Sequence, residues 1–555
     1  MGVLKSFKSG SVGTGVVRCG VGPLVGVRGS YRHPGIKDLQ YNLTAISYSL
    51  SADHPERVAI YLFQPEIRKK NNMRDLAYKV LNIAQQLGAS YADVRVVERT
   101  TEGIDVKNGR VEGISSGTSS GFNVRVIVDG AWGFASSANM DDAEADRVAK
   151  QAIRIARASA LVAGEPVRLS PLAPQHGFYR TPMQKDPFSI PLNQKVQLLL
   201  DADTAMRSVQ GVALTNSNME YSRERKLFTS SEGSEVEQEL YDIGAAINAS
   251  AVDPTSSEIQ TRSYPNSFGR QAGTSGYEFI EAMDLANHGA RIGEEAVKLL
   301  AAPQCPSGVT TIILDGPQAA LQVHESCGHP IELDRVLGME AGFVGKSFLT
   351  IDKLGHYRYG SDIVNMTADA TLSGGLGTFG WDDEGVPAQR SSIVTNGIFT
   401  GYLMSRDTAP ILGLTSNGCV RADGWNRLPM IRMTNVNLEP GTWTLDDLIA
   451  DTADGIYMSI NKSWSIDDLR LNFQFGVELA YEIKHGKLGR MLKNATYTGI
   501  TPQFWGSCDA ICNRDEWVVW GTPNCGKGEP MQTMRTGHGA APARFRNVQV
   551  GVGRW

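Results

Sequence analysis

The sequence contains no apolar run long enough to cross a bilayer and no excess of positive charge. A transmembrane helix needs about 18 consecutive apolar residues, and no segment of the chain comes close to that length. Lys and Arg number 54 against 59 Asp and Glu, so the formal net charge is −5 and no overall basic field is available for nucleic acid. We therefore expect a soluble protein with neither a membrane nor a nucleic acid as its partner.

Glycine and proline are too few for a fibrous or low-complexity chain, and cysteine is sparse. The 59 Gly and 24 Pro among 555 residues fall well short of the content of fibrous or low-complexity chains, so the length predicts a globular protein of roughly three domains. The seven cysteines are odd in number and follow no secretory signal with an apolar centre. This pattern indicates a reducing, cytoplasmic location, where a cysteine is more often a metal ligand or a reactive thiol than half of a disulfide.

Residues 1–72 differ in composition from the remainder. No acidic residue precedes Asp38, and the segment holds ten Lys and Arg against four Asp and Glu. A transit peptide has this bias, and Met1-Gly2 with Ser6 matches a myristoylation pattern. The alternative is an extension that is disordered or not native, because Met73 opens an amphipathic helix. We expect the native fold to begin at Met73.

Beyond residue 72 the pattern predicts an α+β fold, because helices adjoin hairpins and no repeated strand–helix–strand unit is present. The N-terminal domain, residues 73–170, is expected to place helices on an antiparallel sheet. Its expected elements are helices over 73–87 and 141–160, and strands over 92–98, 104–107 and 122–128 with hairpin turns at Asn108-Gly109 and Asp129-Gly130.

Two further domains are expected. The Pro-rich segment 170–191 is typical of a linker, and the middle domain, residues 190–302, ends in a long helix over 277–301. The C-terminal domain, residues 303–555, is mostly strand-like, with hairpin turns at Asn396-Gly397 and His485-Gly486. It also carries the helix with the candidate metal site.

That helix follows a strand-like run over 309–314, and His324, Glu325 and His329 lie at its far end. A zinc-protease helix also has a glutamate beside the first of two histidines, but its histidines are four residues apart, whereas these are five apart. At about 100° per residue, five steps leave the rings about 140° apart, so a regular helix cannot aim both at one metal. A local widening toward five residues per turn, or a break at Gly328-His329-Pro330, would let them converge.

If the two imidazoles bind zinc, Glu325 can activate water as a general base. Catalytic zinc normally has three protein ligands, and the local motif supplies two. The candidates for the third ligand are Glu332, Asp334, His356, His538 and the cysteines. Cys525 is favoured, since the glycines of its loop let the backbone approach an ion and Lys527 would hold the thiolate form. His356 and His538 stay open as alternatives, because imidazole is the commoner ligand in peptidases.

Residues 323–330 resemble the metal motif of the TldD/PmbA family of metallopeptidases, in its TldD-like, metal-binding branch. The other matching segments, in the family's order, are GFNVRV at 121–126, GAWGFAS at 130–136, WDDEGVPAQR at 381–390, RMTN at 432–435 and NCGKG at 524–528. The resemblance spans residues 73–555 and leaves only the first 72 uncovered.

The resemblance implies a peptidase with one Zn²⁺ per chain, held by His324, His329 and Cys525, with Glu325 activating water. It implies unfolded or modified peptides as substrates, bound as extended strands along a sheet edge inside a dimer, with much of the affinity from main-chain hydrogen bonds. The partner subunit would be a second copy or a metal-free, PmbA-like relative.

Other polar residues have both a functional and a structural interpretation. Asp382, Asp383 and Glu384 could bind a substrate amine, although clustered acids in a turn are more often solvated. Arg432 could bind a peptide carboxylate, although an arginine in a strand more often forms a structural salt bridge. Cys508-to-Cys512 spacing in a helical pattern predicts a partly buried thiol pair rather than a second metal site.

Two other functions are compatible with the sequence. A zinc amidase or esterase acting on small molecules would keep the metal and change the bond that is cleaved. A non-catalytic, peptide-binding modulator of a partner would not need Glu325 for its activity.

Overall fold

The computed structural model describes residues 28–31, 39–42, 73–340, 342 and 345–553. Contacts divide the chain into two units, Met1–Ile67 and Arg68–Trp555. In the first unit β1 (Arg28–Tyr31) pairs with β2 (Leu39–Asn42) in antiparallel fashion. The prediction of a disordered or non-native extension falls mostly outside the described residues. Across the described residues, no helix combines the length and the apolar character that a membrane span requires.

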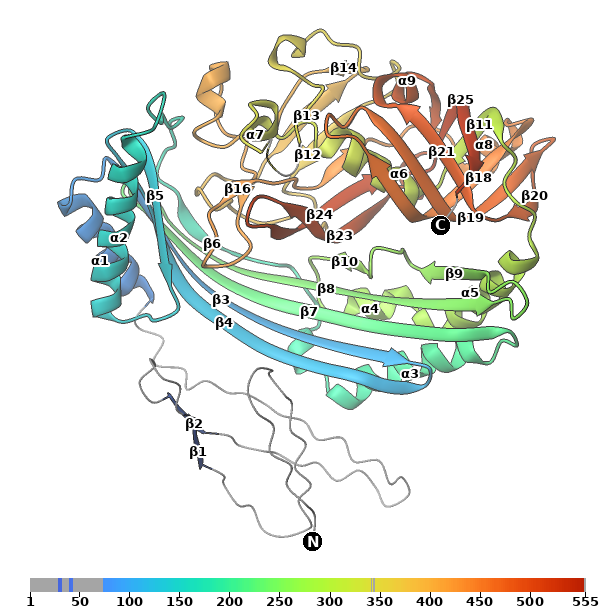
Figure 1. Ribbon diagram of the computed structural model, residues 1–555, viewed down its shortest axis with the longest axis horizontal. Coiled ribbons are helices and arrows are strands. Elements are labelled where there is room, and N and C mark those ends of the chain that lie inside the picture. Colours follow the sequence, from blue (N-terminus) through green and yellow to red (C-terminus); the bar gives the residue numbers. More distant parts are fainter. Residues whose placement is uncertain (1–27, 32–38, 43–72, 341, 343–344, 554–555) are drawn as a thin grey trace. The chain divides into compact units, whose positions relative to one another are not determined.

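One long antiparallel sheet forms the N-terminal part of the second unit (Figure 1). Its main order is β10-β8-β7-β3-β4-β5, and β6 and β9 also pair with β8. The strands are β3 (Tyr91–Lys107), β4 (Arg110–Val128), β5 (Ala131–Ser137), β6 (His176–Arg180), β7 (Val212–Ser230), β8 (Glu235–Val252), β9 (Ile259–Tyr264) and β10 (Gln271–Gly273). The segments predicted as N-terminal and middle domains therefore share a sheet, and their boundaries as domains stay a prediction.

Both predicted hairpins are present in this sheet. Asn108 and Gly109 have φ of 48° and 77°, and Asp129 and Gly130 have φ of 53° and 77°, the left-handed geometry that tight hairpin turns require. The prediction of separate strands over 92–98 and 104–107 is wrong, because β3 is continuous. Its middle residues lack apolar alternation, yet they pair through the backbone with β4 on one side and β7 on the other.

Two groups of helices cover the same face of the sheet. Val94, Val96, Ile104 and Val106 on β3 all point to this face, since alternate residues of a strand share a side. The first group is α1 (Met73–Gln86) and α2 (Asp142–Ala160), and the second is α3 (Leu192–Arg207), α4 (Glu278–Met283) and α5 (Leu285–Ala301). The C-terminal domain lies over the opposite face (Figure 1).

Two predictions for the middle of the chain need correction. The helix expected over 277–301 is two helices, because Asp284 adopts a left-handed conformation with φ 51° between α4 and α5. The expected linker over 170–191 contains β6, which pairs in parallel with residues 235–239 of β8, and a 3₁₀ turn, Pro187–Ser189. The prolines of this segment obscure β6 in the sequence. β6 lies at the edge of the sheet, where only one side of a strand pairs with a neighbour.

The C-terminal domain is mostly β, as predicted, and the α+β fold class is confirmed. Its largest sheet contains β11 (Gly308–Leu314), β18 (Asp454–Ile466), β19 (Asn472–Lys484), β20 (Lys487–Leu492), β21 (Ala495–Ile500), β22 (Cys508–Ile511) and β25 (Ala543–Val552). A second sheet contains β12 (Met366–Asp369), β13 (Arg390–Thr395), β14 (Ile398–Phe399) and β17 (Val436–Leu438). Two separate strand pairs complete the C-terminal domain. They are β15 (Val420–Arg421) with β16 (Met430–Ile431), and β23 (Val518–Lys527) with β24 (Gln532–Ala540).

Short helices connect these strands. They are α6 (Gly316–Val323), α7 (Leu333–Val336), α8 (Leu445–Ala450), α9 (Thr501–Gly506) and the 3₁₀ turns Ile351–Lys353, Ala409–Leu412 and Arg514–Glu516. The predicted turns at Asn396-Gly397 and His485-Gly486 are confirmed by their positive φ angles. The helical pattern predicted for Cys508 and Cys512 is wrong, because Cys508 opens β22; both thiols are buried and free.

Candidate metal centre

The candidate site begins at the end of β11, a strand that pairs with a neighbour on each side. β11 pairs in parallel with β18 and in antiparallel fashion with β25, so its last residues are buried at the middle of the large sheet. Asp315 then caps α6, its carboxylate accepting from the Gly316 N–H at 2.7 Å, and Pro317 occupies the first turn, where no intrahelical donor is needed. The predicted strand, turn and helix are therefore confirmed.

A widened turn follows α6 at the histidine motif. Residues His324–Gly328 form a π-helical turn, in which the His329 N–H donates to the His324 carbonyl at 3.1 Å. The extra residue in the turn offsets the angular separation that a regular helix would impose, and the two imidazole centroids lie 4.9 Å apart. The predicted local widening is confirmed.

Gly328 allows this turn to lie against the neighbouring chain. A Cβ added there would lie 2.1 Å from the Met433 sulfur, and Met433 is fully buried. The Ser326 carbonyl, which Pro330 cannot satisfy because it lacks an N–H, accepts instead from the Tyr359 hydroxyl at 2.9 Å. Gly328 and Pro330 therefore both favour the irregular turn.

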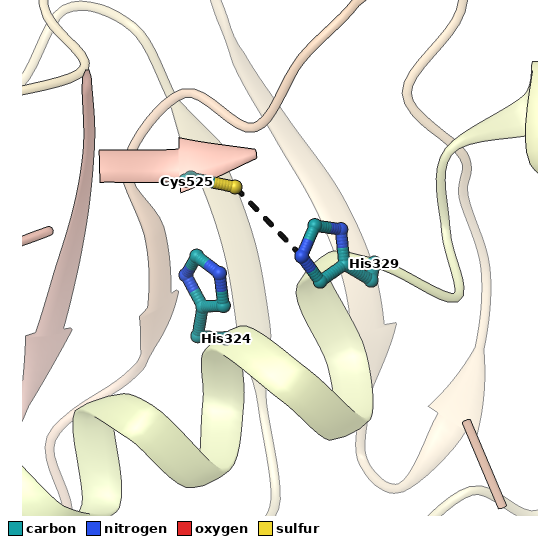
Figure 2. Close-up of side chains that lie close together, drawn as sticks. All are labelled: His324, His329 and Cys525. Carbon is teal, nitrogen blue, oxygen red and sulfur yellow. Dashed lines mark hydrogen bonds between the residues drawn. The ribbon is translucent and has the colours of Figure 1, made fainter. Parts of the chain in front are cut away.

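Cys525 reaches the same place from β23. Its Sγ lies 3.7 Å from His329 Nε2, and one ligand atom from each of His324, His329 and Cys525 lies within 4.8 Å of the others. Figure 2 shows the three side chains directed toward one another, the histidines from the widened turn and the thiol from the strand opposite. Two nitrogens and one sulfur in this arrangement match the donors of a catalytic zinc site.

His538 fixes the tautomer of His324. His538 Nδ1 lies 2.9 Å from the Val436 carbonyl, which can only accept, so this nitrogen carries the proton and Nε2 accepts. His538 Nε2 lies 2.7 Å from His324 Nδ1. His324 Nδ1 must then carry a proton, which leaves the Nε2 lone pair of His324 available to a metal.

Glu332 has the same effect on His329. Its Oε2 accepts from His329 Nδ1 at 3.0 Å, so the lone pair of His329 lies on Nε2, the nitrogen nearest Cys525. Lys527 and Arg335 hold the Glu332 carboxylate with contacts of 3.4 Å and 3.2 Å. Burial raises the pKa of Glu332, but Lys527 and His329 outweigh it and hold that pKa well below its usual range, so Glu332 stays an acceptor.

The protonation states suit a cation. Burial is the main cause that lowers the pKa of His324 and of His329, which favours the neutral rings that a metal binds. Burial raises the pKa of Cys525, but His329 and Arg432 outweigh it and lower that pKa overall. Every other cysteine in the described part of the chain has a raised pKa: Cys305, Cys327, Cys419, Cys508 and Cys512.

The expected role of Lys527 needs correction. Its ammonium is fully buried and donates to Asp334 at 2.8 Å and to the Ile431 carbonyl at 2.9 Å, so its charge serves the acids behind His329. Arg432 lies next to Cys525 instead, donating to the Cys525 carbonyl and, at 3.1 Å, to the Gln532 carbonyl. Of the alternative third ligands, His538 lies behind His324, and His356 is exposed and outside the cluster.

Glu325 is held by a residue that the sequence did not suggest. Its Oε2 accepts from Arg470 Nη1 at 2.7 Å, and its side chain is 7% exposed. Arg470 is 145 residues away in sequence, in the turn between β18 and β19, and no local motif marks it. His538 and Glu332, which the sequence offers as ligands, each lie one hydrogen bond behind a histidine.

Asp382, Asp383 and Glu384 lie between the C-terminal domain and the long sheet. All three are at most 2% exposed, so the structural alternative of solvated acids is wrong. Asp383 pairs with Arg95 at 2.9 Å and with Lys226, and Glu384 lies 3.3 Å from Arg125.

The three carboxyl groups titrate differently in this interface. Burial raises the pKa of Asp382 to about 6 and that of Glu384 to about 8. Burial also raises the pKa of Asp383, but Lys226 and Arg95 outweigh it and bring that pKa down to about 2. Arg95 and Lys226, on the long sheet, thus bind the C-terminal domain through Asp383. Roles of these acids and of the fully buried Arg432 in binding substrate stay predictions.

Three segments of the chain match protein families. Residues 92–156 match the PmbA/TldA metallopeptidase domain 1, residues 185–302 match the central domain, and residues 307–552 match the C-terminal domain.

Curated relatives match over most of their length. A metalloprotease of Methanothermobacter thermautotrophicus is 31% identical over 463 residues, which is 83% of this chain and 95% of the relative. A zinc metalloprotease TldD homolog of Saccharolobus solfataricus is 21% identical over 85% of this chain and 99% of its own.

Solved structures share the fold. A putative modulator of a DNA gyrase from Thermotoga maritima aligns with a TM-score of 0.67 at 16% identity, covering 86% of this chain and 99% of its own. TldE from Thermococcus kodakarensis aligns with a TM-score of 0.66 at 16% identity, covering 86% of this chain and all of its own, 100%. At this identity the likeness concerns the fold alone.

Proposed function

Since the chain belongs to the PmbA/TldD family of metallopeptidases, we propose that it hydrolyses unstructured or modified peptides with one zinc ion per chain. The proposed ligands are His324, His329 and Cys525, and the proposed general base is Glu325. A dimer, formed with a second copy or with a metal-free PmbA-like relative, and a cytoplasmic location belong to the same proposal.

The observation that carries this proposal is the arrangement of the three donor side chains, His324, His329 and Cys525. Three ligand atoms lie within 4.8 Å of one another, each imidazole has its Nδ1 engaged by an outer partner, and the pKa of the Cys525 thiol is lowered. Neutral imidazoles and a thiolate are the forms that bind zinc. The residues present therefore fit the ion, which would act as a Lewis acid toward a carbonyl and toward water.

The protein's own groups would divide the remaining work. Glu325 follows His324 directly, and only one of its two oxygens is engaged by Arg470 in the part of the chain that the structure describes. The other oxygen can take a proton from the attacking water and pass it to the leaving amine. His538 and Glu332 would keep the imidazole lone pairs directed at the centre throughout.

Strand β23 supports an extended substrate. It carries Cys525 and pairs with β24, and no other described strand pairs with it. The Gln271 side chain already takes main-chain groups of β23 at Val519 and Gly521. A peptide added along β23 nearer Cys525 would gain main-chain hydrogen bonds whatever its side chains are. A peptide bond aligned there would lie beside the thiol.

The test compares the full-length protein with Glu325→Gln and with the matched surface variant Glu482→Gln, whose carboxylate pairs with Arg490 on β20 at 3.1 Å. Metal content and turnover of an unstructured peptide are measured together. We expect about one zinc per chain in all three proteins, and a loss of hydrolysis of roughly 10²–10⁴-fold or more in Glu325→Gln alone.

Other outcomes identify other functions. Full turnover by zinc-loaded Glu325→Gln would rule Glu325 out as the base. Cleavage of small amides without cleavage of peptides would indicate an amidase, and peptide binding with no hydrolysis by the zinc-loaded wild type would indicate a non-catalytic modulator.

A further inference from the structure

Arg470 lies at a turn that several contacts hold in place. The turn joins β18 to β19, and the Arg470 N–H donates to the Asp467 carbonyl at 2.9 Å. The Thr501 hydroxyl donates to the Arg470 carbonyl at 3.0 Å, and the Asp467 carboxylate accepts from the Leu471 N–H at 2.7 Å. The backbone of Arg470 is therefore fixed within its turn and against the first residue of α9.

The backbone conformation at Arg470 is unfavourable for an arginine. Its φ is 63°, in the left-handed region, which is strained for a residue with a Cβ and where glycine or asparagine is preferred. Neither of these could reach Glu325 with a cation. The strain indicates that the guanidinium, and not the shape of the turn, accounts for the residue at this position.

The guanidinium of Arg470 makes fewer hydrogen bonds than its donors allow. Nη1 donates to Glu325 Oε2 at 2.7 Å, while the buried Nε has no partner within the described residues. Arginine usually pairs with a carboxylate through two parallel bonds, as Arg125 does with Asp93 through Nε at 3.2 Å and Nη2 at 2.6 Å. Here a single bond leaves donors free for a second acceptor.

Other cations near the centre are less suited to meet a substrate. Lys527 is 0% exposed and bound to Glu332 and Asp334. Arg432 is 0% exposed, and its two terminal nitrogens donate to backbone carbonyls. Arg335 is 0% exposed and paired with Glu332. The Arg470 side chain is 16% exposed, so a bound peptide can reach it.

We propose that Arg470 is a catalytic residue, which donates a hydrogen bond to the oxygen of the scissile carbonyl as negative charge develops on it. This inference rests on the proposed peptidase function. In the first step the water oxygen bonds to the carbonyl carbon, the water proton moves to Glu325, and the C=O electron pair moves onto the carbonyl oxygen. In the second step the C=O bond re-forms, the C–N bond breaks, and Glu325 returns the proton to the leaving nitrogen.

The exchange of partners follows from the charges. Once Glu325 is protonated it no longer holds Arg470 as an ion pair, and in the same step an oxyanion forms that can. The guanidinium thus transfers its interaction from the base to the reacting oxygen without a change in net charge. In a site with little water such a donor stabilises the transition state strongly, and loss of one costs about 10²–10³-fold in kcat.

The test uses the zinc-loaded full-length protein and the variants Arg470→Met, Arg470→Lys and Arg470→Asn. Asparagine tolerates the left-handed conformation, so Arg470→Asn keeps the test valid if the longer side chains destabilise the turn. The matched control is Arg490→Met, which removes an exposed Arg–Glu pair on β20. Zinc content and melting temperature are measured for each variant first.

The expected result is a fall in kcat of about 10²–10³-fold in Arg470→Met and Arg470→Asn, with KM and zinc content close to wild type and partial activity in Arg470→Lys. A binding measurement gives a second readout that needs no turnover. A phosphinic peptide, whose tetrahedral anion mimics the oxyanion, should bind far less tightly to the variants. The same peptide with an uncharged CH₂–CH₂ group in place of the phosphinic group should bind equally to all.

Each outcome decides the inference. A folded, zinc-loaded Arg470→Met with kcat near wild type, or with equal losses for both probes, would overturn it and leave the peptidase function standing. If the wild type hydrolyses no peptide, the proposed function fails, and the ratio between the two probes still decides whether Arg470 recognises an anion at this site. If neither probe binds the wild type, both proposals fall.

Discussion

His538 Nε2 lies 2.7 Å from His324 Nδ1, and this contact determines which nitrogen of His324 faces the metal centre. The outer histidine is itself fixed by the Val436 carbonyl at 2.9 Å. A chain of two neutral imidazoles thus runs from the backbone of β17 to the centre.

Substitution of His538 should weaken metal binding without abolishing it. We expect His538→Ala to lower zinc affinity by about 10–100-fold, as loss of an outer partner usually does, while saturating zinc restores stoichiometric binding. His538→Gln, whose amide oxygen can accept from His324 Nδ1, should lose less. Competition with a chromophoric chelator measures both, and an unchanged affinity in His538→Ala would show that the tautomer of His324 is set in another way.

Substitution of Cys525 should have a larger effect. Cys525→Ala removes one of the three clustered donors, so zinc affinity and turnover should fall together, by more than the roughly 10–100-fold loss expected for an outer partner. His356→Ala is the control, because His356 is exposed and outside the cluster. Elemental analysis after dialysis checks this, and zinc retained by Cys525→Ala but lost by His356→Ala would move the third ligand to His356.

Gly328→Ala should disturb the widened turn. The added methyl would lie 2.1 Å from the sulfur of the buried Met433, so we expect a loss of stability of about 1–3 kcal/mol, as for other overpacked cores. Zinc affinity should also fall because His329 follows directly. Gly506→Ala, with nothing within 4 Å of the new Cβ, is the control. The double variant Gly328→Ala/Met433→Ala should recover zinc affinity, and no recovery would show that another contact requires the glycine.

Asp383 should contribute stability that depends on pH. Its folded pKa of about 2 lies below the ordinary aspartate value of 3.8, so its contribution is present above pH 3.8 and is lost as the pH falls through 2. The shift corresponds to roughly 2 kcal/mol. Asp383→Asn also leaves Arg95 and Lys226 without their partner, so at pH 7 we expect a loss of about 3–5 kcal/mol.

Urea unfolding at pH 7, 4.5 and 3 checks this prediction. The difference between wild type and Asp383→Asn should narrow toward pH 3, because Asp383 takes up a proton in the unfolded chain below pH 3.8 while it is still ionised in the folded protein. Asp454→Asn, which removes an exposed pair with Lys484, should change stability little at any pH. A difference that stays constant from pH 7 to 3 would contradict the assigned pKa.

Local signals in the sequence predicted the parts of the site that depend on local geometry. The five-residue spacing of His324 and His329 required a wider turn, and Gly328 and Pro330 indicated where it would form. Asn-Gly and Asp-Gly pairs predicted the hairpins for the same reason, because a left-handed turn needs particular residues wherever it occurs.

The parts that the sequence did not predict depend on distant segments. Arg470 carries no motif, and its role follows only from a turn that places it beside Glu325. The burial of the acids at 382–384 could not be predicted, because their partners, Arg95, Arg125 and Lys226, lie on strands that come more than 150 residues earlier in the chain. A charge cluster by itself does not reveal whether cations will cover it.

The pairing of β11 with β25 constrains when the centre can form. β11 leads directly into the metal helix, yet one of its two neighbours is β25, more than 200 residues later in the chain. Cys525 and His538 also come after most of the C-terminal domain. A chain still emerging from the ribosome holds both histidines but neither the thiol nor the strand that supports them. The three candidate ligands and both strands that flank β11 are therefore present together only once β25 has been synthesised.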